Sequence, residues 1–311
     1  MSGELGVATL EAGLDVALTL GARALAHAET SGRAVLAGAA FEAEALVLGA
    51  LQREVTLRER SPAQFDVGLE RRVTTGTEAQ LSGPVLYHAL ALPRVDTLYP
   101  DASARTLLNR NLRALLRGYT AAGVPLRYFG TEVLALLGRP VALVGYDQTA
   151  SGAVLLEVFV GLENACVVRS ALKRELPASL WSMVASRPPP MDLLSRVTAG
   201  VVERLGASAV DVSSELPPAP SRAVPDWDDA TPARVAIPLG VVEATLEPRV
   251  RLTGDLLIGR AALAAVEQAA DAVLAAQAAF DEQILRPLEG AALDGARPGD
   301  LLTALRAAQA G

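Results

Sequence analysis

The stretch from Ala45 to Leu92 constrains this chain most, because two apolar runs enclose a short polar loop with paired arginines. The first run breaks at Gly49, and Gln52 ends the segment that follows. The arginines open the loop 71–77, whose other members are small residues, and the second apolar run covers Val85 to Leu92. This order predicts a strand, a connection, a loop with two cations and a buried strand.

The loop has the composition of an anion-binding segment. Small residues let backbone N–H groups approach a phosphate or carboxylate closely. Arg71 and Arg72 add planar donor groups whose geometry suits the same two anions. The alternative is that both arginines are solvated surface charges or ion-pair partners of Glu70.

The arrangement resembles the lipoate–protein ligase branch of the biotin/lipoate ligase superfamily. That branch carries a strand ending in Gly-x-x-Gln and, further on, Arg-Arg-x-Ser/Thr-Gly-Gly-x-Ala. Gly49 and Gln52 match the first motif, and the second is matched by Arg71, Arg72, Thr74, Gly76 and Ala79. Thr75 stands where the family has its first glycine, and Thr77 follows in the same segment.

The resemblance continues into a hairpin in which the family reads Gly-Arg-Lys-Ile/Val-Ala/Ser-Gly. Gly138-Arg139 and Val141-Ala142 match it, but Pro140 stands in place of the lysine. In the family that lysine binds the acyl-adenylate and polarises the acyl carbonyl, whereas proline carries no cation. Lys173 is the single lysine of the chain, so the resemblance leaves Lys173 and Arg139 as candidate replacements.

The resemblance implies a ligand-binding set but identifies no catalytic residue. The candidate ligand-binding residues are Gly49, Gln52, Arg71, Arg72, Thr74, Thr75, Gly76, Thr77, Ala79, Tyr87, His88, Arg139 and Gly145. An active member would attach lipoate or octanoate to a lipoyl-carrier domain, using ATP and Mg or an acyl-carrier protein as donor. The alternatives are a non-catalytic paralogue that binds a ligand or protein, and a structural partner in an assembly.

The fold implied is α+β, with a mixed, largely antiparallel sheet flanked by helices and a small C-terminal accessory domain. We expect a catalytic-type domain over residues 1–212, a proline-rich linker over 213–232 and the accessory domain over 233–311. Helical spacing of apolar residues predicts helices over 10–28, 103–123, 192–205 and 261–285. Gly83-Pro84 predicts a turn before the second apolar strand.

Composition excludes several function classes. The formal net charge of −7 argues against general nucleic-acid binding, which needs a basic face. A single cysteine, Cys166, rules out an internal disulfide and favours a reducing, cytoplasmic location. Two histidines make a histidine-based zinc site unlikely to form, so no metal site is expected. No apolar run reaches the about 20 residues that span a bilayer.

Overall fold

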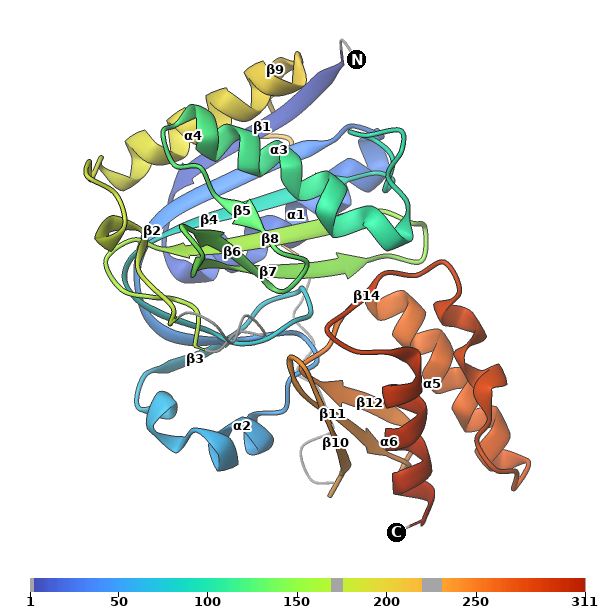
Figure 1. Cartoon of the computed structure of the whole chain (residues 1–311). Coiled ribbons are helices and arrows are strands. Elements are labelled where there is room, and N and C mark those ends of the chain that lie inside the picture. The colour runs from blue at the N-terminus through green and yellow to red at the C-terminus, as the bar shows by residue number, and fades with distance from the viewer. Residues whose placement is uncertain (1–2, 169–175, 220–230, 311) are drawn as a thin grey trace.

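A computed structural model of the chain describes residues 3–168, 176–219 and 231–310 (Figure 1). The strands are β1 (Glu4–Glu11), β2 (Val35–Leu48), β3 (Gly68–Arg71), β4 (Ala79–Leu92), β5 (Arg127–Tyr128), β6 (Val133–Leu136), β7 (Arg139–Gln148), β8 (Val154–Gly161), β9 (Ser208–Asp211), β10 (Ala233–Ile237), β11 (Gly240–Thr245), β12 (Arg251–Gly254), β13 (Leu257–Ile258) and β14 (Leu293–Asp294). The α-helices are α1 (Leu14–Ser31), α2 (Glu54–Arg60), α3 (Leu107–Ala121), α4 (Pro190–Leu205), α5 (Arg260–Ala275) and α6 (Pro298–Ala310). Short 3₁₀ helices are η1 (Pro62–Phe65), η2 (Ala104–Thr106), η3 (Leu180–Ser182) and η4 (Glu282–Leu288).

The large sheet has nine strands in the order β5-β6-β7-β8-β4-β2-β1-β9, and β3 pairs with β2 outside this path. Along the path from β5 to β2 every neighbouring pair of strands is antiparallel, whereas β1 is parallel to both β2 and β9. Strand β3 is also parallel to β2, and it brings the paired arginines alongside the end of β2. The predicted α+β fold with a mixed, largely antiparallel sheet is confirmed.

Both faces of this sheet are buried. Successive residues along a strand point to opposite faces, and in this sheet both sets belong to apolar clusters. In β2, Leu36 and Ala40 belong to the apolar cluster under α3 and α4, whereas Val35 and Ala37 belong to the cluster under α1. Figure 1 shows α3 and α4 side by side over one face and α1 on the other. The strands therefore read as nearly continuous apolar runs in the sequence.

The C-terminal residues build a second, smaller cluster of buried apolar side chains. Strands β10, β11 and β12 form an antiparallel sheet, and residues of α5, η4 and α6 pack on it, among them Val266, Ile284 and Leu301. Residues 220–230 of the predicted linker lie outside the described residues. The proposed domain limits at 212 and 233 stay a prediction.

Three predicted elements differ from the structure. The first helix begins at Leu14, because the residues before it pair as β1 with β2. The predicted turn at Gly83-Pro84 is wrong, since β4 continues through it opposite β2. Pro84 is tolerated there because pairing with β8 begins only at the next residue. The helix predicted over 261–285 ends at Ala275, before the separate η4 segment.

Within the described ranges, none of the helices has the length and apolar character needed to cross a membrane. Also within them, no three histidine, cysteine, aspartate or glutamate side chains gather in a way that could hold a metal ion.

Close packing of α3 on α4 predicts an unusual effect of alanine. A Cβ at Gly118 would lie 2.5 Å from the Val197 carbonyl oxygen and 2.5 Å from a Val201 methyl group. We expect Gly118→Ala to lower the free energy of unfolding by about 1–3 kcal/mol, although alanine favours helices. Gly299→Ala in α6 meets nothing within 4 Å and serves as the matched control. Urea denaturation measures both, and equal effects would contradict this packing argument.

Candidate functional site

The two sequence motifs lie against each other at one end of the large sheet. The Arg72 N–H donates to the Leu48 carbonyl at 2.9 Å, so the loop starts beside the last residue of β2. The Ala50 N–H donates to the Thr74 carbonyl at 2.8 Å, so the loop folds back under the residue after Gly49. A side chain at Gly49 would collide with the Gly76 carbonyl. Only glycine fits where the two motifs touch.

Arg72 is buried inside its own loop, with 1% of its surface exposed. Its guanidinium donates to the carbonyls of Thr75 at 3.0 Å and Thr77 at 2.9 Å, and more weakly to that of Thr74 at 3.4 Å. It also lies 5.9 Å above the centre of the Phe159 ring. Burial lowers the pKa of Arg72 to about 10, so the side chain stays charged at neutral pH. The loop therefore wraps around a cation that it contributes itself.

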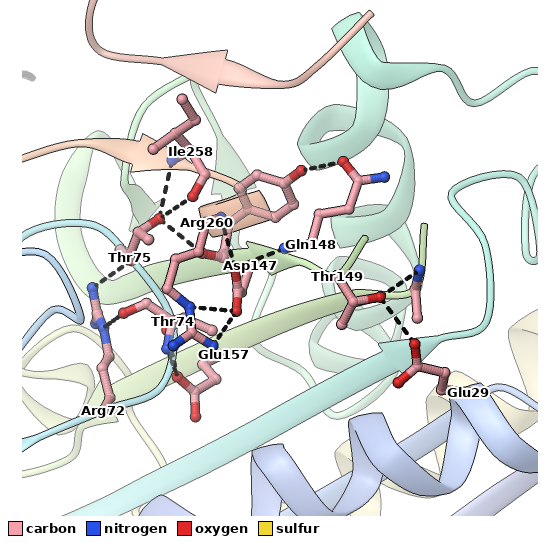
Figure 2. A network of polar contacts seen from close by, with 12 residues as sticks. Glu29, Arg72, Thr74, Thr75, Asp147, Gln148, Thr149, Glu157, Ile258 and Arg260 are labelled. Carbon is pink, nitrogen blue, oxygen red and sulfur yellow. Dashed lines mark hydrogen bonds and ion pairs between the residues drawn. The ribbon is translucent and has the colours of Figure 1, made fainter. Parts of the chain in front are cut away.

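Burial lowers the pKa of Arg72, whereas nearby charges raise it. Among these charges, the carboxylate of Glu157 in β8 raises the Arg72 pKa most. The carboxylate is fully buried and accepts hydrogen bonds from the amide and hydroxyl of Thr74 and from the Tyr87 hydroxyl. Burial, and then Glu157, raise the pKa of Tyr87 well above its ordinary value, so this hydroxyl remains a donor. Figure 2 shows Arg72, Thr74 and Glu157 gathered at this point.

Gly145 makes room for this arrangement. It pairs with Glu157 across β7 and β8, and a Cβ there would collide with the Thr74 hydroxyl and lie 3.1 Å from Cζ of Arg72. The absence of a side chain at Gly145 therefore leaves room for the side chains of Thr74 and Arg72. Ala79, the last residue of the motif, is fully buried and starts β4.

Gln52 joins the site to the small sheet. Its side-chain oxygen accepts from the Gly49 N–H at 2.8 Å, and its amide nitrogen donates to Glu78 at 2.6 Å and to Asp255 at 2.7 Å. Asp255 also accepts from Arg60 at 2.7 Å and from the Val241 N–H at 2.9 Å.

Arg71 donates to the carbonyls of Gly49 at 2.9 Å and Gln52 at 2.6 Å. Nη1 of Arg71, like Nε and Nη2 of Arg72, therefore donates to the protein's own backbone, whereas Nη1 of Arg72 has no partner among the described residues.

Thr75 fastens the loop to two other elements. Its hydroxyl lies 2.8 Å from the carbonyls of both Tyr146 and Ile258 and accepts from the Ile258 N–H at 3.0 Å. Asp147 in the same strand as Tyr146 accepts from the Arg260 side chain at 2.8 Å and from its N–H at 2.9 Å. Figure 2 shows these contacts linking β7 to the segment from Ile258 to Arg260.

Two candidates lie elsewhere. His88 is fully buried on the opposite face of the sheet from Tyr87, and its ring lies 2.8 Å from the Tyr119 hydroxyl of α3. Arg139 starts β7, six residues or roughly 20 Å along the strand from Gly145. Its guanidinium donates to the carbonyls of Leu176 and Pro177, both at 3.1 Å. Lys173 lies outside the described residues.

Sequence reasoning missed Glu157, Glu78, Asp255 and Asp147 as members of this network. The available signal was an acidic residue inside an apolar strand, as in Val154-Leu155-Leu156-Glu157-Val158. A charged residue at such a position is buried only when it is paired or hydrogen-bonded. Its partner, however, cannot be identified from the spacing along the chain.

The coupling between Arg72 and Glu157 predicts non-additive stability. We expect Arg72→Met to lower the free energy of unfolding by about 3–5 kcal/mol, because it leaves a buried carboxylate uncompensated. The double variant Arg72→Met/Glu157→Gln should lose less than the sum of the single losses. A double-mutant cycle by urea denaturation measures this difference. Simple additivity of the two changes would contradict the coupling.

Burial of His88 predicts a loss of stability in acid. Burial lowers its pKa from 6.5 to about 4. Between these values the unfolded chain binds more protons, so the free energy of unfolding falls as the pH drops from 6.5 to 4, by up to about 3 kcal/mol. Urea denaturation across this range should show a shallower slope for His88→Gln than for the control His27→Gln. Identical slopes would contradict this origin.

Comparison with known proteins gives the fold but no close relative. No protein-family model matches the chain, and no curated protein matches it. Among solved structures, LipL1 of P. falciparum in complex with lipoate is similar over 98% of both chains, with 9% identity and a TM-score of 0.59. A lipoate-protein ligase A bound with ATP covers 68% of this chain and 88% of its own, with 14% identity and a TM-score of 0.49. The biotin protein ligase of Leishmania major in complex with biotinyl-5-AMP covers 81% and 98%, with 10% identity and a TM-score of 0.36. The full-length match to the first structure confirms the predicted α+β architecture: the chain has the fold of that structure.

Proposed function

We propose that this chain is a lipoate–protein ligase-like protein that does not adenylate acyl chains and acts as a binding module for a ligand or a protein partner. One observation carries the proposal. The buried Glu157 carboxylate accepts hydrogen bonds from the amide and hydroxyl of Thr74, and among the charges that act on Arg72 it raises the Arg72 pKa most. A carboxylate of the protein thus binds the loop that the resemblance assigns to an external anion.

Several donors of the loop bind the protein itself, whereas Nη1 of Arg72 is buried without a hydrogen-bond partner among the described residues. Arg72 donates to carbonyls of the loop, and Arg71 donates to the carbonyls of Gly49 and Gln52. The Thr75 N–H donates to the Tyr146 carbonyl at 2.9 Å. An adenylate phosphate would have to break these bonds and approach Glu157, a buried like charge. Such an approach is unfavourable, which supports a loop that no longer binds phosphate.

The cation that the family uses on the acyl carbonyl has no counterpart in its usual place. Pro140 pairs within the β6–β7 hairpin and carries no charge. Arg139 beside it donates to two backbone carbonyls. Loss of one such electrostatic donor typically costs about 10²–10³ in rate. This supports a binding role over transfer.

An active acyltransferase is the second candidate, favoured by a specific observation. The chain matches LipL1 of P. falciparum, solved with lipoate, over 98% of both lengths, so the accessory part is included. In this candidate the set from Gly49 to Gly145 would hold lipoate or octanoate. ATP with Mg, or an acyl-carrier protein, would supply the activated acyl group to a lipoyl-carrier domain. For both candidates we propose a cytoplasmic location.

Intact-mass spectrometry of an apo lipoyl domain separates the two candidates. The domain is incubated with the protein and either lipoate or octanoate with Mg-ATP, or octanoyl-acyl-carrier protein. We expect no acyl mass shift with either donor, beside a working ligase as positive control. A shift would overturn the non-catalytic proposal, and the donor that works would identify a ligase or a transferase.

The binding role needs its own measurement. Calorimetric titration of the protein with octanoate, lipoate and the apo lipoyl domain should detect binding of at least one. Glu157→Gln should leave binding of the lipoyl domain unchanged, because this side chain is fully buried. If none of the three binds, a binding module for these partners is excluded, whatever the acyl-transfer result.

A further inference from the structure

A pocket of about 470 Å³ lies at the other end of the large sheet from the arginine loop. It is lined by the start of β1, the end of α1, the start of β2, residues 97–99, one side chain of α3 and the end of α4. The arginine loop adjoins the opposite end of β2, a strand of 14 residues or roughly 45 Å. Figure 1 shows β1 with the end of α4 at one extreme of the sheet and β3 at the other. The volume falls in the range of small-molecule sites.

The side chains around this pocket carry an excess of positive charge in a protein that is acidic as a whole. Arg33, Arg117 and Arg204 line the pocket, whereas Glu4 is its one acidic lining residue. Glu4 is already bound to Arg33 at 2.7 Å. Arg117 and Arg204 form no ion pair within the part of the chain that the structure describes.

The helix ends at the pocket oppose this charge only in part. The carboxyl ends of α1 and α4 are capped by Gly32 and Gly206, and such ends carry roughly half a negative charge. These partial negative charges stabilise the positive charge of the nearby arginines without forming a hydrogen bond to them. The two unpaired guanidinium groups remain available for an anion.

Tyr99 lines the pocket beside Arg117. Cζ of Arg117 lies 5.9 Å from the centre of the Tyr99 ring, within the range of a cation–π contact. The Tyr99 hydroxyl is buried and has no hydrogen-bond partner among the described residues, so it does not face the open space of the pocket.

Among the remaining lining residues, Leu5, Leu98 and Leu205 form an apolar part, beside the hydroxyl-bearing Ser31 and Thr97. An inorganic anion alone would leave this surface without contacts, whereas an organic group would cover it. We propose that this pocket binds a small organic phosphate monoester. Arg117 and Arg204 would hold the phosphate, whose charge near −2 at neutral pH matches two guanidinium groups.

Phenyl phosphate tests this site by isothermal titration calorimetry with the full chain. We expect Arg117→Gln and Arg204→Gln each to weaken binding about tenfold, the effect of losing one charge-assisted hydrogen bond. Arg196→Gln is the matched control, because it removes an exposed arginine of the same helix α4 outside the pocket. Tyr99→Phe should leave the affinity unchanged, because the hydroxyl is buried away from the space of the pocket.

A gain of affinity provides a test that a folding defect cannot imitate. Glu4→Gln removes the only lining carboxylate and releases Arg33. We expect about two- to fivefold tighter binding of phenyl phosphate, since an exposed ion pair of this kind is worth little by itself.

Three results would overturn the proposal. The first is no heat of binding for phenyl phosphate with the unmodified protein. The second is equal weakening by Arg196→Gln and Arg204→Gln, which would indicate general surface charge. The third is equal affinity for benzoate, which would remove the assignment to phosphate. The acyl-transfer assay reports on the opposite end of the sheet, so its outcome is independent of this test.

Discussion

The arrangement of the arginine loop depends on the burial of Arg72. A guanidinium removed from water needs hydrogen-bond acceptors and a compensating charge. The carbonyls of the loop supply the acceptors, and Glu157 supplies the nearest strong opposing field. This requirement fixes the shape of the loop and keeps β7 free of a side chain at Gly145. Arg72 thus has a structural role, because its guanidinium holds the carbonyls of the loop in place.

The same loop, together with Gln52, ties the large sheet to the C-terminal residues, which form two further small sheets. Thr75 binds the backbone of Ile258, and Gln52 binds Asp255, so both motifs of the large sheet reach the C-terminal residues. Arg260 adds charged hydrogen bonds to Asp147 of β7. Because these groups are buried or half-buried, each bond replaces a water contact that would be lost in the interior. The position of the small sheet is therefore tied to the conformation of the loop.

The fold could be predicted because its signals are local. Nearly continuous apolar runs in the strands and helical spacing in α3 and α4 indicate elements, and two short motifs in the correct order indicate the architecture. The structure adds that the two motifs touch, with Gly49 directly against Gly76. The turn predicted at Gly83-Pro84 failed, because pairing with β2 continues through those residues and outweighs their local preference for a turn.

The sequence by itself determined the sheet with its covering helices, the loop with two arginines, and the absence of a lysine at Pro140. Only the tertiary structure decided where the arginine donors point and which carboxylates meet them. Glu157 is 83 residues from Thr74 along the chain, and the register of β7 on β8 sets it beside Gly145. The pocket between β1, α1, α3 and α4 likewise joins residues from distant segments. Local patterns specify elements, whereas the partners of buried polar groups depend on how those elements pack.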